Sequence, residues 1–255
     1  MLKTLRALLL GATLAASAAL PAGAQAIAPA QKAEFEKLIR EYLLRNPEVL
    51  QEALVELDRR QREAEMVARQ SVLKDQAGPL YASKFNAVAG NPNGDVTLVE
   101  FFDYNCGYCK RGLTDLQKLI REDNKLKVVL KDLPILSPAS REAAAVALAV
   151  KTMVKPEQFW DYHTRLMAKT GQIGKQQALE VATAIGLDKA KVEDELNRTP
   201  VAEAFDETRK LADGLNMTGT PAYVLADDVV IGAVGYDQLK ARIANVRKCG
   251  KNVCD

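Results

Sequence analysis

Residues 96–110 read VTLVEFFDYNCGYCK, and this stretch decides the fold. The segment 96–102 is β-branched and aromatic with few polar interruptions, which is typical of a buried central strand. Cys106 and Cys109 follow it directly. Two cysteines at positions i and i+3 at the start of a helix can form a small disulfide ring, and the first thiol then lies at the positive end of the helix dipole. The pattern predicts a strand that leads into a reactive redox pair.

The residues after the cysteines complete a strand-helix-strand unit. Residues 110–121 carry apolar side chains at helical spacing, and residues 126–133 form a second apolar run with the character of a strand. A crossover helix favours parallel pairing of the strands that it connects. The sequence therefore predicts an α/β fold with the cysteines between a central strand and the helix that follows it.

The rest of the chain is organised around this unit. Residues 79–137 and 217–255 are assigned to one α/β domain, whose start is bounded by the turn-rich segments Gly78-Pro79 and 90–94. Residues 138–216 are predicted to be an inserted helical domain. Its helices are expected at 139–153, 156–168, 175–185, 188–196 and 200–215, and after it a hairpin at 222–225 and 229–233 and a helix at 236–247 close the α/β domain.

The N-terminus predicts export. In residues 1–26, Lys3 and Arg6 precede an apolar run and then a small-residue stretch, as in a secretory signal peptide with cleavage after Ala24 or Ala26. The run is too short to span a bilayer, although an anchor helix that stays attached is the alternative interpretation. Removing this segment deletes two of the 35 basic residues and none of the 33 acidic ones, which leaves a formally neutral, soluble protein. Nothing in this balance points to nucleic acid or anionic lipid as a partner.

Residues 27–78 are predicted to be a helical extension with helices at 33–45 and 47–76. The second helix places a series of small and apolar residues along one seam at roughly heptad spacing. Two interpretations remain open. In the first, the helix is docked on its own domain or is a solvated connector. In the second, it is part of a stalk that forms a homo-oligomer through residues 33–76. The seam consists of Leu50, Leu54, Leu57, Ala64, Ala68 and Ser71.

A second cysteine pair, Cys249 and Cys254, lies at the C-terminus. Export makes disulfides permissible, and we expect a structural disulfide here worth about 2 kcal/mol. The alternatives are a zinc site shared with Cys106 and Cys109, and a catalytic role for the second pair.

Two further residues are candidates for the redox site. Glu100 is a carboxylate in an otherwise apolar strand, and a buried carboxylate with a raised pKa can exchange protons with the second thiol. A satisfied core acid or an edge-facing one is the alternative. Pro221, after Thr220, stands between the helical insertion and the hairpin. In the cis form it would expose backbone polar groups to a substrate strand, whereas spacing alone favours an ordinary trans turn.

The motif at 101–110, the helical insertion and the Gly-Thr-Pro at 219–221 together resemble the DsbA family of periplasmic thiol-disulfide oxidoreductases, over about residues 95–247. The resemblance implies a thioredoxin-like fold in which Cys106 attacks, Cys109 resolves, Glu100 assists and Pro221 is cis. It also implies that Lys131 can pair with Glu100. The expected location is the periplasm, and the expected partners are exported cysteine-containing proteins and a membrane redox partner of the DsbD, ScsB or DsbB kind.

Two features resemble other members of this group more than DsbA itself. The dipeptide Gly107-Tyr108 is similar to that of the isomerase DsbC, and so is Thr220 before the proline. We expect Gly107, Tyr108, Thr220 and Pro221 to contact the substrate. The N-terminal helices resemble the extension of the ScsC-like subgroup. Because Gly107 and Tyr108 add no cation beside Cys106, we expect a less extreme oxidant than DsbA.

The sequence therefore favours a disulfide isomerase or reductase, with a DsbA-type oxidase as the alternative. No metal site is expected, and no cofactor beyond the redox-active disulfide of Cys106 and Cys109. Functions of another class are a module that holds Cu(I) on these two thiolates and a chaperone-like holdase.

Overall fold

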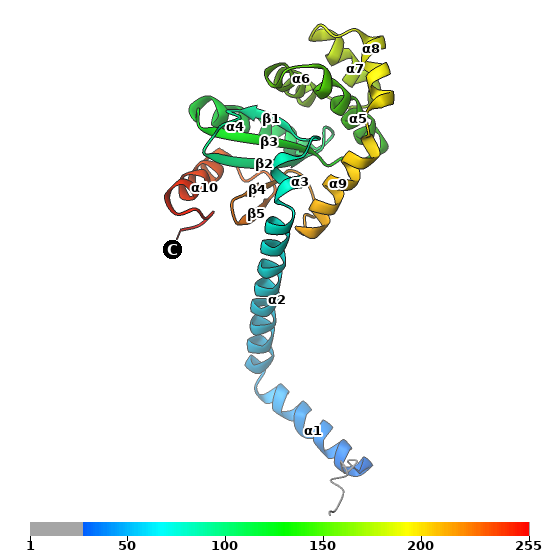
Figure 1. Cartoon of the computed structure of the whole chain (residues 1–255). Coiled ribbons are helices and arrows are strands. Elements are labelled where there is room, and N and C mark those ends of the chain that lie inside the picture. The colour runs from blue at the N-terminus through cyan, green and yellow to red at the C-terminus, as the bar shows by residue number, and fades with distance from the viewer. Residues whose placement is uncertain (1–27, 255) are drawn as a thin grey trace, which may run out of the picture. The chain divides into compact units, whose positions relative to one another are not determined.

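A computed structural model of the chain describes residues 28–254 (Figure 1), so the predicted signal peptide at 1–26 lies outside the described residues. Among the residues described, no helix is both long and apolar enough to cross a bilayer. The elements in chain order are α1 (Pro29–Arg45), α2 (Glu48–Asp75), α3 (Ala77–Ala82), β1 (Ala87–Gly90), β2 (Val96–Phe102), α4 (Gly107–Glu122), β3 (Leu126–Asp132), α5 (Pro138–Met153), α6 (Pro156–Ala168), α7 (Lys175–Ala184), α8 (Lys189–Arg198), α9 (Val201–Gly214), β4 (Ala222–Leu225), β5 (Asp228–Ile231) and α10 (Tyr236–Cys249).

The strands form one mixed sheet in the order β1-β3-β2-β4-β5. β2 and β3 pair in parallel, which confirms the predicted βαβ unit, and Glu100 lies beside Leu130 in their register. β4 pairs antiparallel with β2 and with β5, which confirms the predicted hairpin. β2 is the middle strand of the five, with β3 on one side and β4 on the other.

The two faces of the sheet are covered by different helices. Side chains alternate along a strand, so Leu98 and Phe102 of β2 point to one face and Val99 and Phe101 to the other. The first face packs against α4 and α10, and its core extends into α5, α6 and α7 of the insertion. The second face packs against α3, α9 and the C-terminal end of α2, where Leu73 is buried. The insertion and the sheet thus share one core.

Two short elements were not predicted. Gly78 and Pro79 lie inside α3 and not in a turn, which corrects the sequence-based interpretation. Proline is tolerated in the first turn of a helix because the amide hydrogen that it lacks has no partner there, and the buried Leu80 fixes α3 against the sheet. β1 ends at Gly90, where the turn-rich segment begins; its Ala87 and Ala89 are small residues with little strand character of their own.

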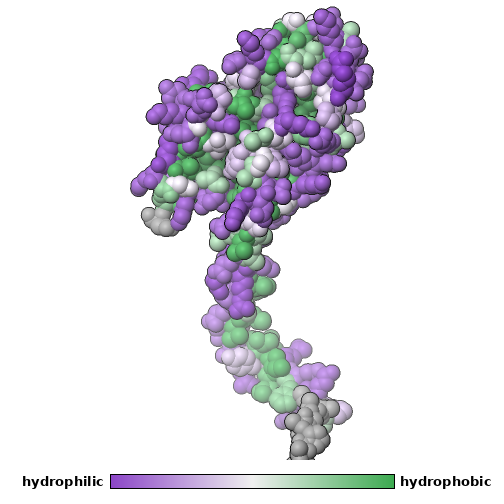
Figure 2. Space-filling model, viewed as in Figure 1, coloured by the Kyte–Doolittle hydropathy of each residue, from purple (hydrophilic) through white to green (hydrophobic). Residues whose placement is uncertain are grey.

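The chain divides into two compact units, one ending at Asp58 and the other beginning at Arg59. This division falls within α2, whereas the sequence placed the end of the extension at residue 78. The N-terminal unit contains α1 and the first part of α2, and α1 has no buried residue. Its apolar side chains lie on the surface, as the green residues of these helices in Figure 2 show. The exposed ones are Phe35, Leu38, Ile39, Tyr42, Leu44, Leu50, Leu54, Val55 and Leu57.

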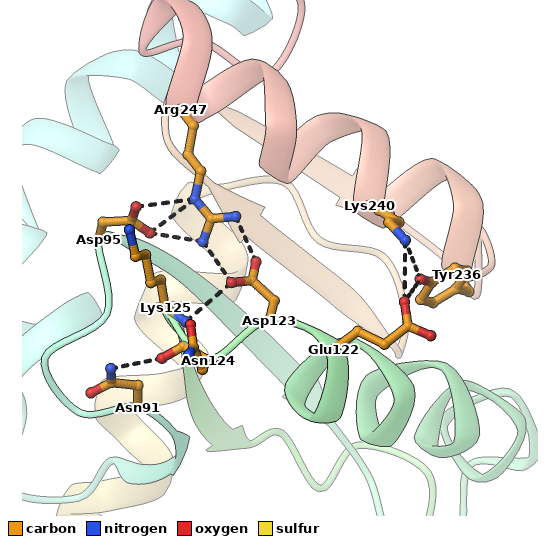
Figure 3. Close-up of polar contacts among 9 residues, drawn as sticks. All are labelled: Asn91, Asp95, Glu122, Asp123, Asn124, Lys125, Tyr236, Lys240 and Arg247. Carbon is orange, nitrogen blue, oxygen red and sulfur yellow. Dashed lines mark hydrogen bonds and ion pairs between the residues drawn. The ribbon is translucent and has the colours of Figure 1, made fainter.

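Charged contacts fix α10 to the edge of the βαβ unit (Figure 3). The Arg247 guanidinium is 2.8 Å from an oxygen of Asp95, just before β2, and 2.6 Å from an oxygen of Asp123, after α4. Near the start of α10, Lys240 lies 3.1 Å from the carboxylate of Glu122 on α4. These contacts hold α10 at the end of the sheet where β2 begins, and Cys106 follows the other end of that strand.

The expected pairing of Lys131 with Glu100 is wrong. Lys131 stands beside Phe101 in the β2–β3 register, so its side chain points to the α3 and α9 face and away from Glu100. There its ammonium is 3.1 Å from Glu207 of α9 and also donates to the Pro79 carbonyl and the Asn86 side chain. Burial lowers the pKa of Lys131, and the contact with Glu207 opposes this shift.

We predict that Glu207→Ala destabilises the fold by about 2 kcal/mol, because it leaves a buried ammonium with one acceptor fewer. Glu203, also on α9, pairs with Lys84 at the surface, where their side chains are 59% and 66% exposed. Glu203→Ala is the matched control and should cost less than about 0.5 kcal/mol. Urea unfolding measures both, and equal losses would contradict the assignment.

Candidate active site

The end of β2 places Cys106 at the start of a helix. After Phe102 the chain turns sharply, with the amide of Cys106 donating to the Asp103 carbonyl at 3.0 Å. Cys106 is the N-cap of α4, so the free amides of the first helical turn point toward its sulfur. The strand therefore delivers the first cysteine to the positive end of the α4 dipole, as the sequence predicted.

The thiol of Cys106 is stabilised in its ionised form. The residue is 5% exposed, and its Sγ accepts a hydrogen bond from the Cys109 amide at 3.2 Å. The pKa of Cys106 is lowered to about 6, mainly by a hydrogen bond from the Cys109 thiol and further by the amides of Cys109 and Tyr108, against the opposing effect of burial. At neutral pH the thiolate therefore predominates, and a thiolate is the nucleophilic form of cysteine.

Cys109 has the opposite character. It lies in the first turn of α4 and is 1% exposed. Its pKa is raised because its thiol donates to Cys106 and because it is buried, and the nearby carboxyl of Glu100 raises it further. The two thiols are not bonded to each other here. Cys106 is thus ready to attack, and Cys109 retains its proton.

Glu100 is buried on the α4 face of the sheet, 2% exposed. Burial raises its pKa to about 8, and a hydrogen bond from the Tyr223 hydroxyl opposes this shift. The prediction of a buried carboxylate with a raised pKa is confirmed. Glu100 also lies close enough to Cys106 and Cys109 for their charges to interact.

Tyr223 is a residue of this site that the sequence analysis missed. It lies directly opposite Glu100 in the β2–β4 pairing and is equally buried. Its hydroxyl occupies the space where a side chain at Gly112 of α4 would begin, 3.0 Å from that Cβ position. The signal was available, since Tyr223 follows Pro221 by two residues on a predicted strand, but only the register reveals its neighbour.

The peptide bond between Thr220 and Pro221 is cis, as expected. The Thr220 carbonyl faces the redox pair, and the Cys106 thiol donates to it at 3.1 Å when the thiol carries its proton. The structure thus brings Thr220 and Pro221 to Cys106 from a segment far away in the sequence.

The dipeptide between the cysteines forms the first turn of α4. Tyr108 is 61% exposed, and the Arg111 guanidinium lies over its ring at 4.1 Å. Lys110 is not simply solvated, because its ammonium donates to the Lys169 carbonyl of the insertion at 2.6 Å. Gly107 and Tyr108 are therefore presented at the surface beside the buried sulfur of Cys106.

The second cysteine pair is separate from this site. Cys249 and Cys254 form a disulfide with an S–S distance of 2.08 Å after α10. They therefore offer no thiolates for a zinc site shared with Cys106 and Cys109. Between residues 28 and 254 no group of three or more His, Cys, Asp or Glu side chains is placed to hold a metal ion.

His163 and Asp132 also have shifted pKa values, but they lie outside the redox site. His163 is stacked on Trp160 and contacts the Tyr104 hydroxyl through Nδ1 at 3.2 Å, and burial lowers its pKa to about 3. This agrees with the packing role that is the default for both residues. Burial raises the pKa of Asp132, at the end of β3, to about 7.

The raised pKa of Glu100 predicts a pH dependence of stability. A carboxyl whose pKa rises from 4.5 to about 8 on folding stabilises the fold fully below about pH 4.5, and this contribution is lost as the pH rises through about 8. Glu100→Gln removes the titration. In urea unfolding of the reduced protein, the variant should lose less stability than the wild type between these pH values. Asp132 titrates in both proteins, so parallel profiles would show that Glu100 is not the group.

Comparison with known families places this site in context. The chain matches the family described as DSBA-like thioredoxin domain over residues 97–244, which contain both cysteines, Glu100 and Pro221. Residues 31–64 match the Copper resistance protein ScsC N-terminal domain. The second match covers α1 and the first part of α2.

Individual relatives agree with these matches. The chain is 29% identical over 172 residues to Disulfide bond formation protein D of Bacillus subtilis, covering 63% of this chain and 76% of the relative. A thioredoxin-like oxidoreductase from Silicibacter pomeroyi is 34% identical, with a TM-score of 0.63, over 68% of this chain and 98% of that one. Proteus mirabilis ScsC in a transitional conformation is 31% identical, with a TM-score of 0.63, over 85% and 96%. The chain therefore belongs to the DsbA-like thioredoxin family, as an ScsC-like thiol-disulfide oxidoreductase.

Proposed function

We propose that this oxidoreductase reduces and rearranges disulfides of exported proteins in the periplasm. The observation that carries the proposal is the asymmetry of the two thiols, with Cys106 acidic at the start of α4 and Cys109 buried and protonated. An acidic first thiol and a protonated second thiol suit an enzyme that attacks with the first and resolves with the second.

The exchange needs no further reactant besides the substrate disulfide. The Cys106 thiolate bonds to one substrate sulfur, and the other substrate sulfur leaves with the electron pair of the broken bond. In isomerisation that freed thiolate attacks another disulfide of the substrate, and a substrate thiolate finally releases Cys106 unchanged. In reduction the Cys109 sulfur attacks Cys106 Sγ instead, which forms the Cys106–Cys109 disulfide and leaves both substrate sulfurs reduced.

Glu100 is proposed to take the proton of Cys109 in the resolving step. A proton acceptor works best when its pKa lies near the working pH, and the pKa of Glu100 is about 8. The hydrogen bond from Tyr223 limits the rise that burial causes, and Tyr223 is therefore a positioning residue for this carboxyl.

The acidity of Cys106 supports a reductase or isomerase over an oxidase. The nucleophilic thiol of the strong oxidant DsbA has a pKa of about 3.5 and that of thioredoxin about 7, because a more stable thiolate favours the reduced form. In this protein the pKa of Cys106 is lowered mainly by the hydrogen bond from the Cys109 thiol. Gly107 and Tyr108 add no cation, and the Arg111 guanidinium lies over the Tyr108 ring.

The substrate is proposed to bind across Thr220, Pro221, Gly107 and Tyr108. The exposed Tyr108 ring supplies an apolar surface, and the backbone at Thr220 and Pro221 lies beside the attacking sulfur. A membrane redox partner of the DsbD or ScsB kind is proposed to return Cys106 and Cys109 to the reduced state. An oxidase would instead need a DsbB-like partner.

The helices α1 and α2 are proposed to join copies of this chain. Their exposed apolar side chains include Leu50 and Leu57, one heptad apart, and a second copy would bury them. These helices lie within the match of residues 31–64 to the ScsC N-terminal family or continue from it. Several active sites facing one substrate favour isomerisation, because each successive exchange becomes intramolecular.

We predict that the mature protein reactivates scrambled ribonuclease, and that Leu50→Glu with Leu54→Glu lowers this activity by about tenfold or more through the loss of oligomers. Reduction of a small disulfide by one active site should stay unchanged. Sedimentation velocity reports the oligomeric state of the same samples.

The matched control replaces Gln51 and Gln61, two exposed polar residues of α2, by glutamate. It adds the same charge and should keep both oligomers and activity. Cys106→Ser should abolish all exchange. A protein that leaves scrambled ribonuclease inactive but rapidly oxidises a reduced peptide is a DsbA-type oxidase, and the proposal of isomerisation is then wrong.

A further inference from the structure

Asn105, the residue before Cys106, is bonded to the insertion by every polar atom of its side chain. Its Oδ1 accepts from the Ile173 amide at 2.7 Å, and its Nδ2 donates to the Ile173 carbonyl at 2.8 Å. The same Nδ2 lies 3.1 Å from the Ser140 hydroxyl of α5. The planar side-chain amide thus pairs with the Ile173 backbone as a neighbouring strand would.

The backbone of Asn105 belongs to the turn that presents the nucleophile. Its amide donates to Asp103 Oδ1 at 2.8 Å, and Asp103 Oδ2 accepts from the Leu136 amide at 3.0 Å. The next amide, of Cys106, closes the turn on the Asp103 carbonyl. One residue therefore links the loop before α7, the start of α5 and the turn that carries Cys106.

The position of this turn matters to the chemistry of the sulfur. Cys106 Sγ is held at 3.2 Å from the Cys109 amide, and a hydrogen bond of this kind weakens when its distance or angle changes. Within residues 28–254, the hydrogen bonds of the Cys106 sulfur go to Thr220 and Cys109, and neither residue belongs to the insertion. Tyr104 and Lys110 also bond to the insertion, but Asn105 directly precedes Cys106 in the turn.

We propose that Asn105 is a positioning residue through which the helical insertion holds Cys106 against the first amides of α4. The inference deepens the proposed function and rests on it, since it assigns the insertion a part in preparing the nucleophile. Asparagine suits the position because the Ile173 backbone requires a donor and an acceptor on one short side chain. Aspartate supplies only acceptors and would face the Ile173 carbonyl with a repulsive oxygen.

Asn105→Ala in the mature protein tests the proposal through the reactivity of Cys106. We expect the Cys106 thiol of the variant to be a tenfold weaker acid. Near pH 6, where the thiol of the unmodified protein is half ionised, alkylation by iodoacetamide should therefore slow about fivefold. Near pH 9, where both proteins are ionised, the rates should agree. Ultraviolet titration of the thiolate should show the same rise in the pKa of Cys106. Asn105→Asp should behave like Asn105→Ala in both measurements.

Asn91→Ala is the matched control. The Asn91 side chain also bonds the backbone in both directions, to the Asn124 carbonyl and from the Asn93 amide, at the other end of the domain (Figure 3). It should lower stability without altering the titration of Cys106. An equal rise of the Cys106 pKa in both variants, or no rise in Asn105→Ala, would overturn the inference.

A second variant tests the route through the insertion. Ser140→Ala removes one partner of Asn105 and should slow alkylation near pH 6 by less than Asn105→Ala, with no added effect in the double variant. Additive effects would contradict a shared route. The thiol titration does not depend on substrate, so it stands even if the ribonuclease experiment shows that isomerisation is the wrong function.

Discussion

The hydrogen bonding between Cys109 and Cys106 at the start of α4 is the interaction on which the site depends. It lowers the pKa of one thiol and raises that of the other, so two identical side chains acquire different chemistry from their places in one helical turn. The arrangement needs β2 to end where α4 begins and needs Thr220 to approach from β4. The central position of β2 in the sheet supplies both conditions.

The sheet separates two buried charges that lie close together in the fold. Glu100 faces α4 and the cysteines, while Lys131 faces α3 and α9, because neighbouring positions in the register point to opposite sides. The lysine is neutralised by Glu207 and takes no part in the redox site. Because Lys131 lies on the other face, burial keeps the pKa of Glu100 high, as the proposed proton transfer requires.

Local patterns were enough to predict much of this structure. The cysteines, the buried strand before them and the five helices of the insertion follow from spacing and residue type, whereas the pattern alone left open whether Glu100 is buried or faces the edge of the sheet. The partner of Lys131 and the role of Tyr223 depend on the register between strands, which no single segment encodes. α3 and β1 were not predicted because glycine and proline indicate turns and alanine does not favour a strand. The packing of Leu80 stabilises α3, and the pairing of Ala87 and Ala89 with β3 stabilises β1.

The burial of His163 limits which groups can respond to acidity. Histidine is ordinarily the side chain that gains a proton in mildly acidic surroundings, and this sequence has one, whose pKa is held near 3. Within the described residues, Cys106, Asp132 and Glu100 have pKa values of about 6, about 7 and about 8. An acidifying compartment would therefore act on this enzyme through its nucleophile and its buried carboxyls, without an imidazole sensor between the environment and the chemistry.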